Sequence, residues 1–411
     1  MYLYLSVAFG LLAISAVQSS SSNGGGFNLR PFRINLSSGV SRMLNFVNNT
    51  QLPGGPEYLG ASAGIPLDTL KSLRAEWLTR FDWDKEQLAI NAFNHFTAEV
   101  EGLTIHFIHE KSRTPNAIPL ILIHGWPGSF LEFLPVIDPL LQNSKTSTDT
   151  PITFDIIIPS LPGYAFSSAP PQNWTIDDTA RVYNTLMTDV LGYSEYATHG
   201  TDWGSFVAYS LYGNFNGSVR ASHFCFLPFS PQSPTELAAL NVSLSPLEAY
   251  EEQEAMTFDS SGIGYTIEQS TEPNTIGLAL YDNPVGQLAW IGQKFLNWSD
   301  PRAGTPPSVL DHNEILKSVS LYYLTKSLVS SMYIYFQNPE ALKTVYSKAQ
   351  TDAPMLFSGF KYNPGFWPPA LVAQVGNLVL YRNHDFGGHF AGIDNPPALI
   401  KDLREIGTYW A

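Results

Sequence analysis

Short apolar runs alternate with helix-like segments through the middle and the end of this chain. The runs at 118–123 and 156–158 are continuous, which is typical of strands buried on both faces. Helix-like patterns follow them near 130–141 and within 179–191. Another apolar run, at 378–381, indicates that strands resume close to the C-terminus. This alternation of strands and helices predicts an α/β fold with a mostly parallel sheet.

Two regions depart from this alternation. The N-terminal region contains a helix-like segment at 67–81 and ends in an alternating strand pattern at 103–108. Residues 230–350 have helical stretches rich in Tyr and Trp without a series of strands, as expected of a cap inserted into an α/β domain. The predicted segments are an N-terminal domain (27–115), a first part of the core (116–229), the cap (230–350) and a last part of the core (351–411).

The N-terminus predicts entry into the secretory pathway. Residues 1–19 form an apolar segment that reads as a signal peptide, and an uncleaved anchor in the endoplasmic reticulum membrane is the alternative. Asn-x-Ser/Thr acceptor sequences favour the same route. The six acceptor asparagines are Asn35, Asn48, Asn173, Asn216, Asn241 and Asn297. We therefore expect a secreted glycoprotein, with membrane contact only if the segment is uncleaved.

Composition narrows the partners. The chain has 411 residues, of which 44% are hydrophobic, so it can bury a large core. A formal net charge of −14 argues against nucleic acid as a partner. The single Cys225 lies in an apolar run, so we expect a buried thiol and no intrachain disulfide. We find no metal-ligand spacing and no nucleotide-binding glycine motif in the sequence, and we expect no metal and no cofactor.

The sequence Gly-Thr-Asp-Trp-Gly-Ser at 200–205 carries the most specific chemistry. It has the form of a nucleophile elbow, in which small residues make room for one exposed side chain, here Asp202. An aspartate is ionised at neutral pH and can attack an sp³ carbon to give an ester, which suits epoxides and alkyl halides. The oxyanion formed when water cleaves that ester needs backbone donors. We expect these donors to be Trp203, directly after the nucleophile, and Trp126 in the glycine-rich turn at 124–129.

Two unrelated glycine-rich turns would be the simpler explanation. Their order along the chain, each behind an apolar strand, favours a catalytic pair instead. With further motifs, the chain resembles the microsomal-type epoxide hydrolases over nearly its whole length after the signal segment. The N-terminal motifs of this resemblance lie at 31–32, 81–83, 96–97 and 102–109. The resemblance implies an α/β-hydrolase fold with an inserted helical cap and an N-terminal domain that wraps the catalytic domain as a meander.

The resemblance also implies the site residues. The nucleophile position falls on Asp202, and the general base falls on His389, which follows two glycines. The two cap tyrosines that act as the acid fall on Tyr265 and Tyr335, with Tyr333 as a rival for the second. A histidine or tyrosine met alone is more often a packing residue, so these assignments depend on their motif contexts.

One position departs from the family pattern. On an ungapped match, Asn363 stands where a carboxylate should orient the histidine. A neutral amide can fix the tautomer of the imidazole but cannot stabilise its protonated form. Ester hydrolysis should therefore suffer more than epoxide opening. The other carboxylates that could substitute are Asp352, Asp385 and Asp394.

The sequence thus predicts an epoxide hydrolase that makes a vicinal diol through an ester on Asp202. An aromatic cap favours a small apolar epoxide, as in detoxification. The cap aromatics are Trp290, Trp298, Tyr281 and Phe295. One alternative is a tailoring enzyme that opens or cyclises an epoxide in a natural-product pathway, and another is a catalytically impaired secreted binding protein. Haloalkane dehalogenation is a more distant variant. The pair of acid tyrosines disfavours it, because a leaving halide needs to be bound rather than protonated.

Overall fold

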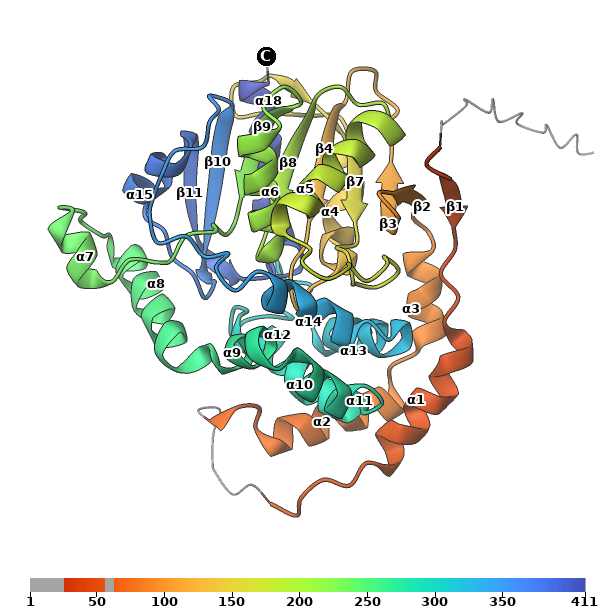
Figure 1. Ribbon diagram of the computed structural model, residues 1–411. Coiled ribbons are helices and arrows are strands. Elements are labelled where there is room, and N and C mark those ends of the chain that lie inside the picture. The colour runs from red at the N-terminus through yellow and green to blue at the C-terminus, as the bar shows by residue number, and fades with distance from the viewer. Residues whose placement is uncertain (1–25, 56–62, 411) are drawn as a thin grey trace, which may run out of the picture.

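A computed structural model describes residues 26–55 and 63–410 of the chain. Nine strands form one sheet in the order β1-β2-β3-β7-β4-β8-β9-β10-β11 (Figure 1). The six strands from β7 to β11 in this order run parallel, whereas β1, β2 and β3 form an antiparallel edge. The strands span β1 (Arg30–Phe32), β2 (His95–Val100), β3 (Leu103–Glu110), β7 (Phe154–Pro159), β4 (Ile118–Ile123), β8 (Tyr196–Gly200), β9 (Val219–Phe224), β10 (Pro354–Tyr362) and β11 (Asn377–Gly388). A separate two-stranded sheet comprises β5 (Ser144–Lys145) and β6 (Pro151–Ile152).

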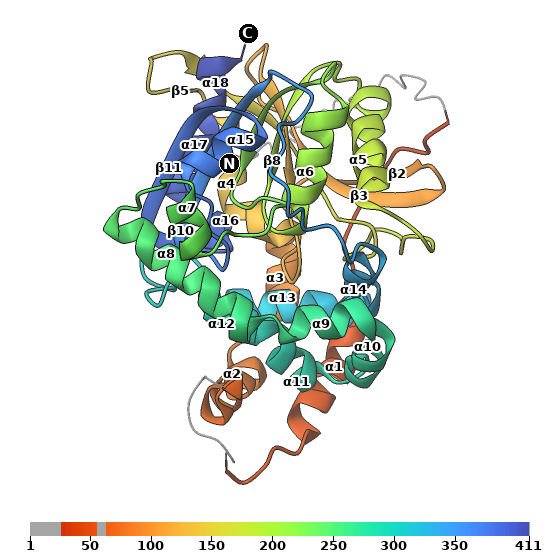
Figure 2. The same cartoon turned by 60° about the vertical axis from the view of Figure 1, so that its left-hand side comes forward.

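Helices cover both faces of the large sheet. Helices α5 and α6 pack together on one face, and α4 and α17 pack together on the other (Figure 2). The helices of the core are α4 (Leu134–Leu141), α5 (Ile176–Thr185), α6 (Trp203–Asn214), α15 (Pro369–Val375), α16 (Ala391–Asp394), α17 (Pro396–Arg404) and α18 (Ile406–Tyr409). Strands β4 and β7 are buried on both faces, which explains their continuous apolar runs. The predicted α/β fold class with a mostly parallel sheet is confirmed.

Between β9 and β10 the chain is helical and lies below the sheet in Figure 1. The helices of this cap are α7 (Pro234–Ala239), α8 (Pro246–Thr257), α9 (Gly264–Thr271), α10 (Pro273–Leu280), α11 (Pro284–Gln287), α12 (Gln293–Asn297), α13 (His312–Thr325) and α14 (Leu328–Gln337). Two π-helical turns, η4 (Phe258–Gly262) and η5 (Leu288–Gly292), join them. The cap covers the carboxyl ends of the parallel strands, where an open α/β sheet places its ligands.

The N-terminal region runs from the sheet edge to the far side of the cap. From β1 the chain descends to α1 (Ser37–Asn49) and α2 (Leu67–Thr79), below the cap, and returns through α3 (Trp83–Ile90) to β2 (Figure 1). The Trp77 indole donates a 3.1 Å hydrogen bond to Ser320 of α13. Arg42 of α1 pairs with Asp282 of the cap, which also accepts a 2.8 Å hydrogen bond from Tyr323. This region therefore holds the cap from outside.

Two predicted helices differ in detail. The segment expected to be helical near 130–141 begins as a 3₁₀ turn, η2 (Phe130–Phe133), and becomes α-helical at α4, where a proline in the first turn favours a new helix start. Helix α5 begins before the expected 179–191 because Thr175 and Asp178 form a capping box. A π-helical turn, η3 (Leu186–Val190), extends it.

The predicted signal segment 1–19 lies outside the described residues. Among the helices of residues 26–55 and 63–410, none combines the length and hydropathy that crossing a bilayer requires.

Candidate active site

The nucleophile elbow joins β8 to α6. Asp202 has φ 47° and ψ −131°, a conformation that a non-glycine residue adopts only when its surroundings enforce it. Neighbouring glycines leave the space for this turn. A Cβ atom at Gly204 would lie 1.9 Å from the carbonyl oxygen of Ile123, and one at Gly125 would lie 2.1 Å from Oδ1 of Asp202. The glycines on either side of the elbow are therefore required by the close approach of the two loops.

The Asp202 carboxylate has two distinct oxygens. Oδ1 accepts a 2.6 Å hydrogen bond from the backbone N–H of Trp126. Oδ2 lies 3.4 Å from Nε2 of His389. Of the two predicted oxyanion donors, Trp126 is the one that bonds this carboxylate in the described structure, and the backbone N–H of Trp203 lies at the first turn of α6 beside it. Oδ1 is thus held by the loop, whereas Oδ2 faces the histidine.

The hydrogen bonds of His389 determine its tautomer. Its Nδ1 lies 2.9 Å from Oδ1 of Asn363, and the Nδ2 group of Asn363 donates a 2.9 Å bond to the carbonyl of Cys225. A carbonyl can only accept, so the amide nitrogen must face Cys225 and the amide oxygen must face the ring. Nδ1 therefore carries the proton, which leaves Nε2 as an acceptor directed at Asp202. The backbone N–H of His389 also donates to Trp298, at 2.7 Å.

The structure places Asn363 behind His389, at the end of β10, as the sequence match predicts. The substitute carboxylates bond elsewhere among the described residues. Asp352 pairs with Lys348 at 2.9 Å, and Asp385 is exposed. Asp394 accepts hydrogen bonds from Asp300 N (2.8 Å) and Ser308 Oγ (3.0 Å). The imidazole is therefore oriented by a neutral amide.

The two predicted tyrosines lie on the cap side of the same space. The ring of Tyr335, on α14, packs edge-on against Trp203 at 4.8 Å, and Tyr265, on α9, stacks on Trp126 at 5.1 Å. The hydroxyl of Tyr335 is buried without a hydrogen-bond partner among the described residues. The rival Tyr333 bonds Asn274 at 3.0 Å and does not line this space.

Burial raises the pKa of both Tyr265 and Tyr335, and the charge of Asp202 raises both further. Both phenols therefore stay protonated at neutral pH and can donate a hydrogen bond. This is the protonation state that an acid for a departing oxygen requires.

A cavity of about 170 Å³ connects these groups. Asp202, His389, Tyr265 and Tyr335 all line it. Its remaining wall is mainly apolar and includes Phe206, Phe226, Phe258, Ile263, Trp298 and Pro364. The sequence analysis did not find most of these wall residues, because they come from separate elements and share no motif. The site can therefore bring an apolar molecule against a carboxylate, a base and two acids.

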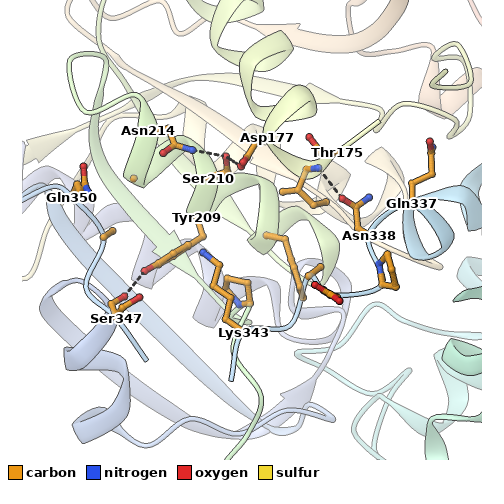
Figure 3. A pocket seen from close by; sticks show the side chains of 18 of the residues that line it. Thr175, Asp177, Tyr209, Ser210, Asn214, Gln337, Asn338, Lys343, Ser347 and Gln350 are labelled. Atoms are coloured by element: carbon orange, nitrogen blue, oxygen red, sulfur yellow. Dashed lines mark hydrogen bonds between the residues drawn. The ribbon is translucent and has the colours of Figure 1, made fainter. Parts of the chain in front are cut away.

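A second hollow, of about 670 Å³, lies beside α5 and α6 (Figure 3). Its side chains are mostly polar, and Ser210 donates a 2.6 Å hydrogen bond to Asp177. The Lys343 amine lies 5.0 Å from the ring centre of Tyr209. This hollow contains none of the predicted catalytic residues, so we assign it no part in the chemistry. The residues that line both it and the catalytic cavity are Phe206, Asn338, Pro339 and Ala341.

His199, His223 and Cys225 have potential metal-ligand atoms within 4.8 Å of one another. The Nδ1 atoms of the two histidines lie 2.9 Å apart, in one hydrogen bond, and Nε2 of His223 lies 2.9 Å from Ser358 Oγ. Burial lowers the pKa of both histidines and raises the pKa of the Cys225 thiol, so a thiolate ligand is disfavoured. We interpret this group as a hydrogen-bonded row inside the sheet and assign no metal to it.

Known proteins share the fold and the family of this chain. Residues 29–133 match the family model described as epoxide hydrolase N terminus, and residues 118–253 match the alpha/beta hydrolase fold. Epoxide hydrolase 1 of Oryctolagus cuniculus is 30% identical over 404 residues, which cover 92% of this chain and 88% of the relative.

Two solved structures of epoxide hydrolases have a similar fold. The Aspergillus niger epoxide hydrolase has a TM-score of 0.79 and 34% identity, covering 93% of this chain and 96% of that one. The juvenile hormone epoxide hydrolase of the silkworm Bombyx mori has a TM-score of 0.82 and 26% identity, covering 94% and 96%. The chain belongs to the epoxide hydrolases that join this N-terminal domain to an α/β-hydrolase fold.

Proposed function

We propose that this epoxide hydrolase acts through a covalent ester on Asp202. Oδ2 attacks an epoxide carbon, the carbon–oxygen bond breaks, and its electron pair stays on the departing oxygen. That oxygen takes the phenolic proton of Tyr265 or Tyr335. Because Oδ1 is already bonded by the N–H of Trp126, it becomes the carbonyl oxygen of the ester, in position for the second step.

In that step, His389 acts as general base. Nε2 removes a proton from water, and the resulting hydroxide attacks the ester carbonyl carbon of Asp202. Negative charge then develops on Oδ1, where the N–H of Trp126 and the nearby N–H of Trp203 can stabilise it. When the intermediate collapses, the ester carbon–oxygen bond breaks and the leaving alkoxide takes the proton that remains on the added hydroxyl, which regenerates the carboxylate and releases a vicinal diol. The proton taken from water returns to the phenolate left by the first step.

Asn363 makes ester hydrolysis the slower half of this cycle. It fixes the tautomer of His389 but supplies no negative charge to stabilise the imidazolium that forms when water loses its proton. Replacing the corresponding acid by its amide in a serine protease costs about 10⁴-fold in turnover. We therefore propose that the ester accumulates during turnover.

One observation carries the proposal. A single carboxylate has one oxygen bonded by a backbone N–H at 2.6 Å and the other 3.4 Å from Nε2 of His389, while two un-ionised phenols share its cavity. This arrangement supports attack on carbon, protonation of the leaving oxygen and hydrolysis at one point in space. A serine at position 202 would need its own base, which an aspartate does not.

The cavity supports a small apolar epoxide as substrate. Its volume of about 170 Å³ lies below the roughly 300–1,000 Å³ of typical ligand pockets. Aromatic walls favour hydrocarbon over charged groups. We propose that small aryl or alkyl epoxides fit the observed state and that larger ones require the cap to move.

We also propose that the protein enters the secretory pathway. The six acceptor asparagines, all of them exposed, are Asn35, Asn48, Asn173, Asn216, Asn241 and Asn297. Exposure is what glycosylation requires, so the pattern supports a glycosylated product. The alternative is that the N-terminal segment is not cleaved and anchors the protein in the endoplasmic reticulum membrane, which is part of the same pathway.

Single-turnover mass spectrometry tests the catalytic proposal. Enzyme in excess is mixed with small apolar epoxides, and both the diol and an epoxide-sized adduct on the Asp202 peptide are followed over time. We expect an adduct that forms faster than it disappears. Asp202→Asn should form no adduct at early times, and diol production without any adduct in the native protein would contradict the covalent route.

A further inference from the structure

A buried lysine lies directly behind one of the acid tyrosines. Lys294, on α12, is only 6% exposed. Its Nζ lies 4.7 Å from the ring centre of Tyr265, 5.7 Å from that of Trp290 and 5.8 Å from that of Trp298. It donates a 2.6 Å hydrogen bond to the neutral Gln293 side chain. The ammonium group of Lys294 is therefore largely removed from water and contacts aromatic rings instead.

This lysine forms no ion pair with a carboxylate of the described chain. The groups of its surroundings that can carry charge are Glu254 on α8, Glu268 on α9, Tyr265 on α9 and Tyr362 at the end of β10, all lining one hollow with it. Among the described residues, neither glutamate forms an ion pair with Lys294. A buried cation without a negatively charged partner is costly, so its retention calls for a compensating interaction.

The catalytic reaction supplies such an interaction. Lys294 does not line the cavity that holds Asp202, whereas Tyr265 lines both that cavity and the hollow on the lysine side. When the epoxide opens, the charge of Asp202 disappears into the ester and reappears on the departing oxygen or on the phenol that protonates it. A cation over the face of that phenol is attracted more strongly as the ring gains negative charge.

We propose that the Lys294 ammonium is a positioning residue that stabilises the charge developing on Tyr265 during epoxide opening. This inference rests on the proposed ester mechanism. Tyr265 gives its proton to the epoxide oxygen and becomes a phenolate, and Lys294 keeps its own protons and compensates the phenolate charge. The proton released during ester hydrolysis then restores Tyr265.

The ionisation of Lys294 gives this role a pH dependence. Burial lowers the pKa of Lys294 from its usual value near 10.5 to about 8. The cation is therefore present below about pH 8 and is lost above it. The rate of ester formation should fall as pH rises through this range, well before exposed lysines titrate.

The test is the single-turnover rate of ester formation on Asp202 between pH 6 and 10, with a small apolar epoxide. At pH 7, Lys294→Met should lower the rate by about 10- to 100-fold and remove its decline near pH 8. Lys294→Arg should keep most of the rate and hold it to higher pH, because arginine stays charged. Lys343→Met is the matched control, since Lys343 also lies over a tyrosine ring but lines only the hollow of Figure 3.

A Tyr265→Phe background separates this role from a structural one. If Lys294 acts through the phenol, Lys294→Met should change the rate less than about twofold there. An equal loss in both backgrounds, or a native pH profile in Lys294→Met, would overturn the inference. Absence of any adduct in the native protein would instead contradict the ester mechanism itself. As a measurement without turnover, NMR of ¹³C-labelled lysine should show one resonance titrating near pH 8 that is missing in Lys294→Arg.

Discussion

The side-chain oxygen of Asn363 lies 2.9 Å from Nδ1 of His389, in the position from which a carboxylate would support the imidazole. The same amide donates to the carbonyl of Cys225, so both of its ends are engaged. The amide is therefore built into the site with complementary partners on each side, and it holds the ring without charging it.

Asn363→Asp should accelerate ester hydrolysis while leaving ester formation nearly unchanged. The new carboxylate would stabilise the imidazolium of His389, and we expect the adduct to disappear about 10- to 10³-fold faster. The hydrogen bond to the carbonyl of Cys225 would be lost, and a carboxylate oxygen of the new aspartate would face that carbonyl oxygen, so that two acceptors lie opposite each other. Unfolding should therefore become easier by about 1–2 kcal/mol.

The decay of the Asp202 adduct after rapid mixing measures the first effect, and denaturant unfolding measures the second. Asn363→Leu serves as the control, because it removes the acceptor without adding charge and should slow the decay. An aspartate variant with native or slower decay would show that the amide does not limit hydrolysis.

Tyr335→Phe should lower activity and leave stability intact or improved. The hydroxyl has no hydrogen-bond partner among the described residues, so its removal relieves a buried polar atom that costs roughly 1–3 kcal/mol. Ester formation should fall by about 10- to 100-fold, because one of two proton donors is lost. In rapid-mixing experiments the rate of ester formation should thus fall, whereas the melting temperature should stay the same or rise. Tyr333→Phe, whose hydroxyl bonds Asn274, should leave the kinetics native.

Glu251→Gln should stabilise the protein above neutral pH. Burial raises the pKa of Glu251 to about 7, and its Oε2 accepts a 2.5 Å hydrogen bond from Asn383 of β11. The folded protein therefore binds this proton more tightly than the unfolded chain does, so its unfolding free energy falls as pH rises from about 4.5 through 7. Above that range the loss amounts to about 3 kcal/mol, which a neutral glutamine avoids.

Melting temperatures at pH 5 and pH 8.5 measure this effect. The difference between Glu251→Gln and the native protein should be more positive at pH 8.5 by roughly 2–4 °C. Glu272→Gln changes an exposed carboxylate of the cap and should shift both temperatures equally. The same offset at both pH values for Glu251→Gln would contradict the assignment.

Glycosylation should appear at the acceptor asparagines when the protein is made in a eukaryotic secretory host. Enzymatic release of N-glycans in H₂¹⁸O converts each occupied asparagine into a labelled aspartate that peptide mass spectrometry detects. Asn45 is exposed but lies outside any acceptor sequence, so it should stay unlabelled. Secretion without label at all six acceptor sites would contradict a glycosylated product.

The sequence predicted elements whose residues share one environment. Strands β4 and β7 have continuous apolar runs because both of their faces are buried, and they lie where the runs indicated. Strand β9 was not predicted, because it contains Ser222 and His223. Their polar groups are satisfied by Thr198 and by His199 and Ser358 in neighbouring strands, and no one-dimensional pattern shows such cross-strand bonds.

The candidate site shows the same division. Asp202, Trp126 and His389 stand in motifs that glycines mark, because tight turns restrict which residues can occupy them. Lys294 carries no such mark. Its significance comes from packing on Tyr265, 29 residues earlier in the chain and on another cap helix. Contacts of this kind are made by tertiary folding and have no local residue code.

The N-terminal helices supply no atom to the catalytic cavity, yet they grip the cap through Trp77 and Arg42. If the cap must move to admit a bulky epoxide, its movement would strain or break these contacts. The free energy needed to open the cap therefore depends partly on residues outside it. The range of substrate sizes that the enzyme admits is then linked to how firmly the N-terminal helices hold the cap. Selection for larger substrates could then act on α1 and α2 without altering a single wall residue.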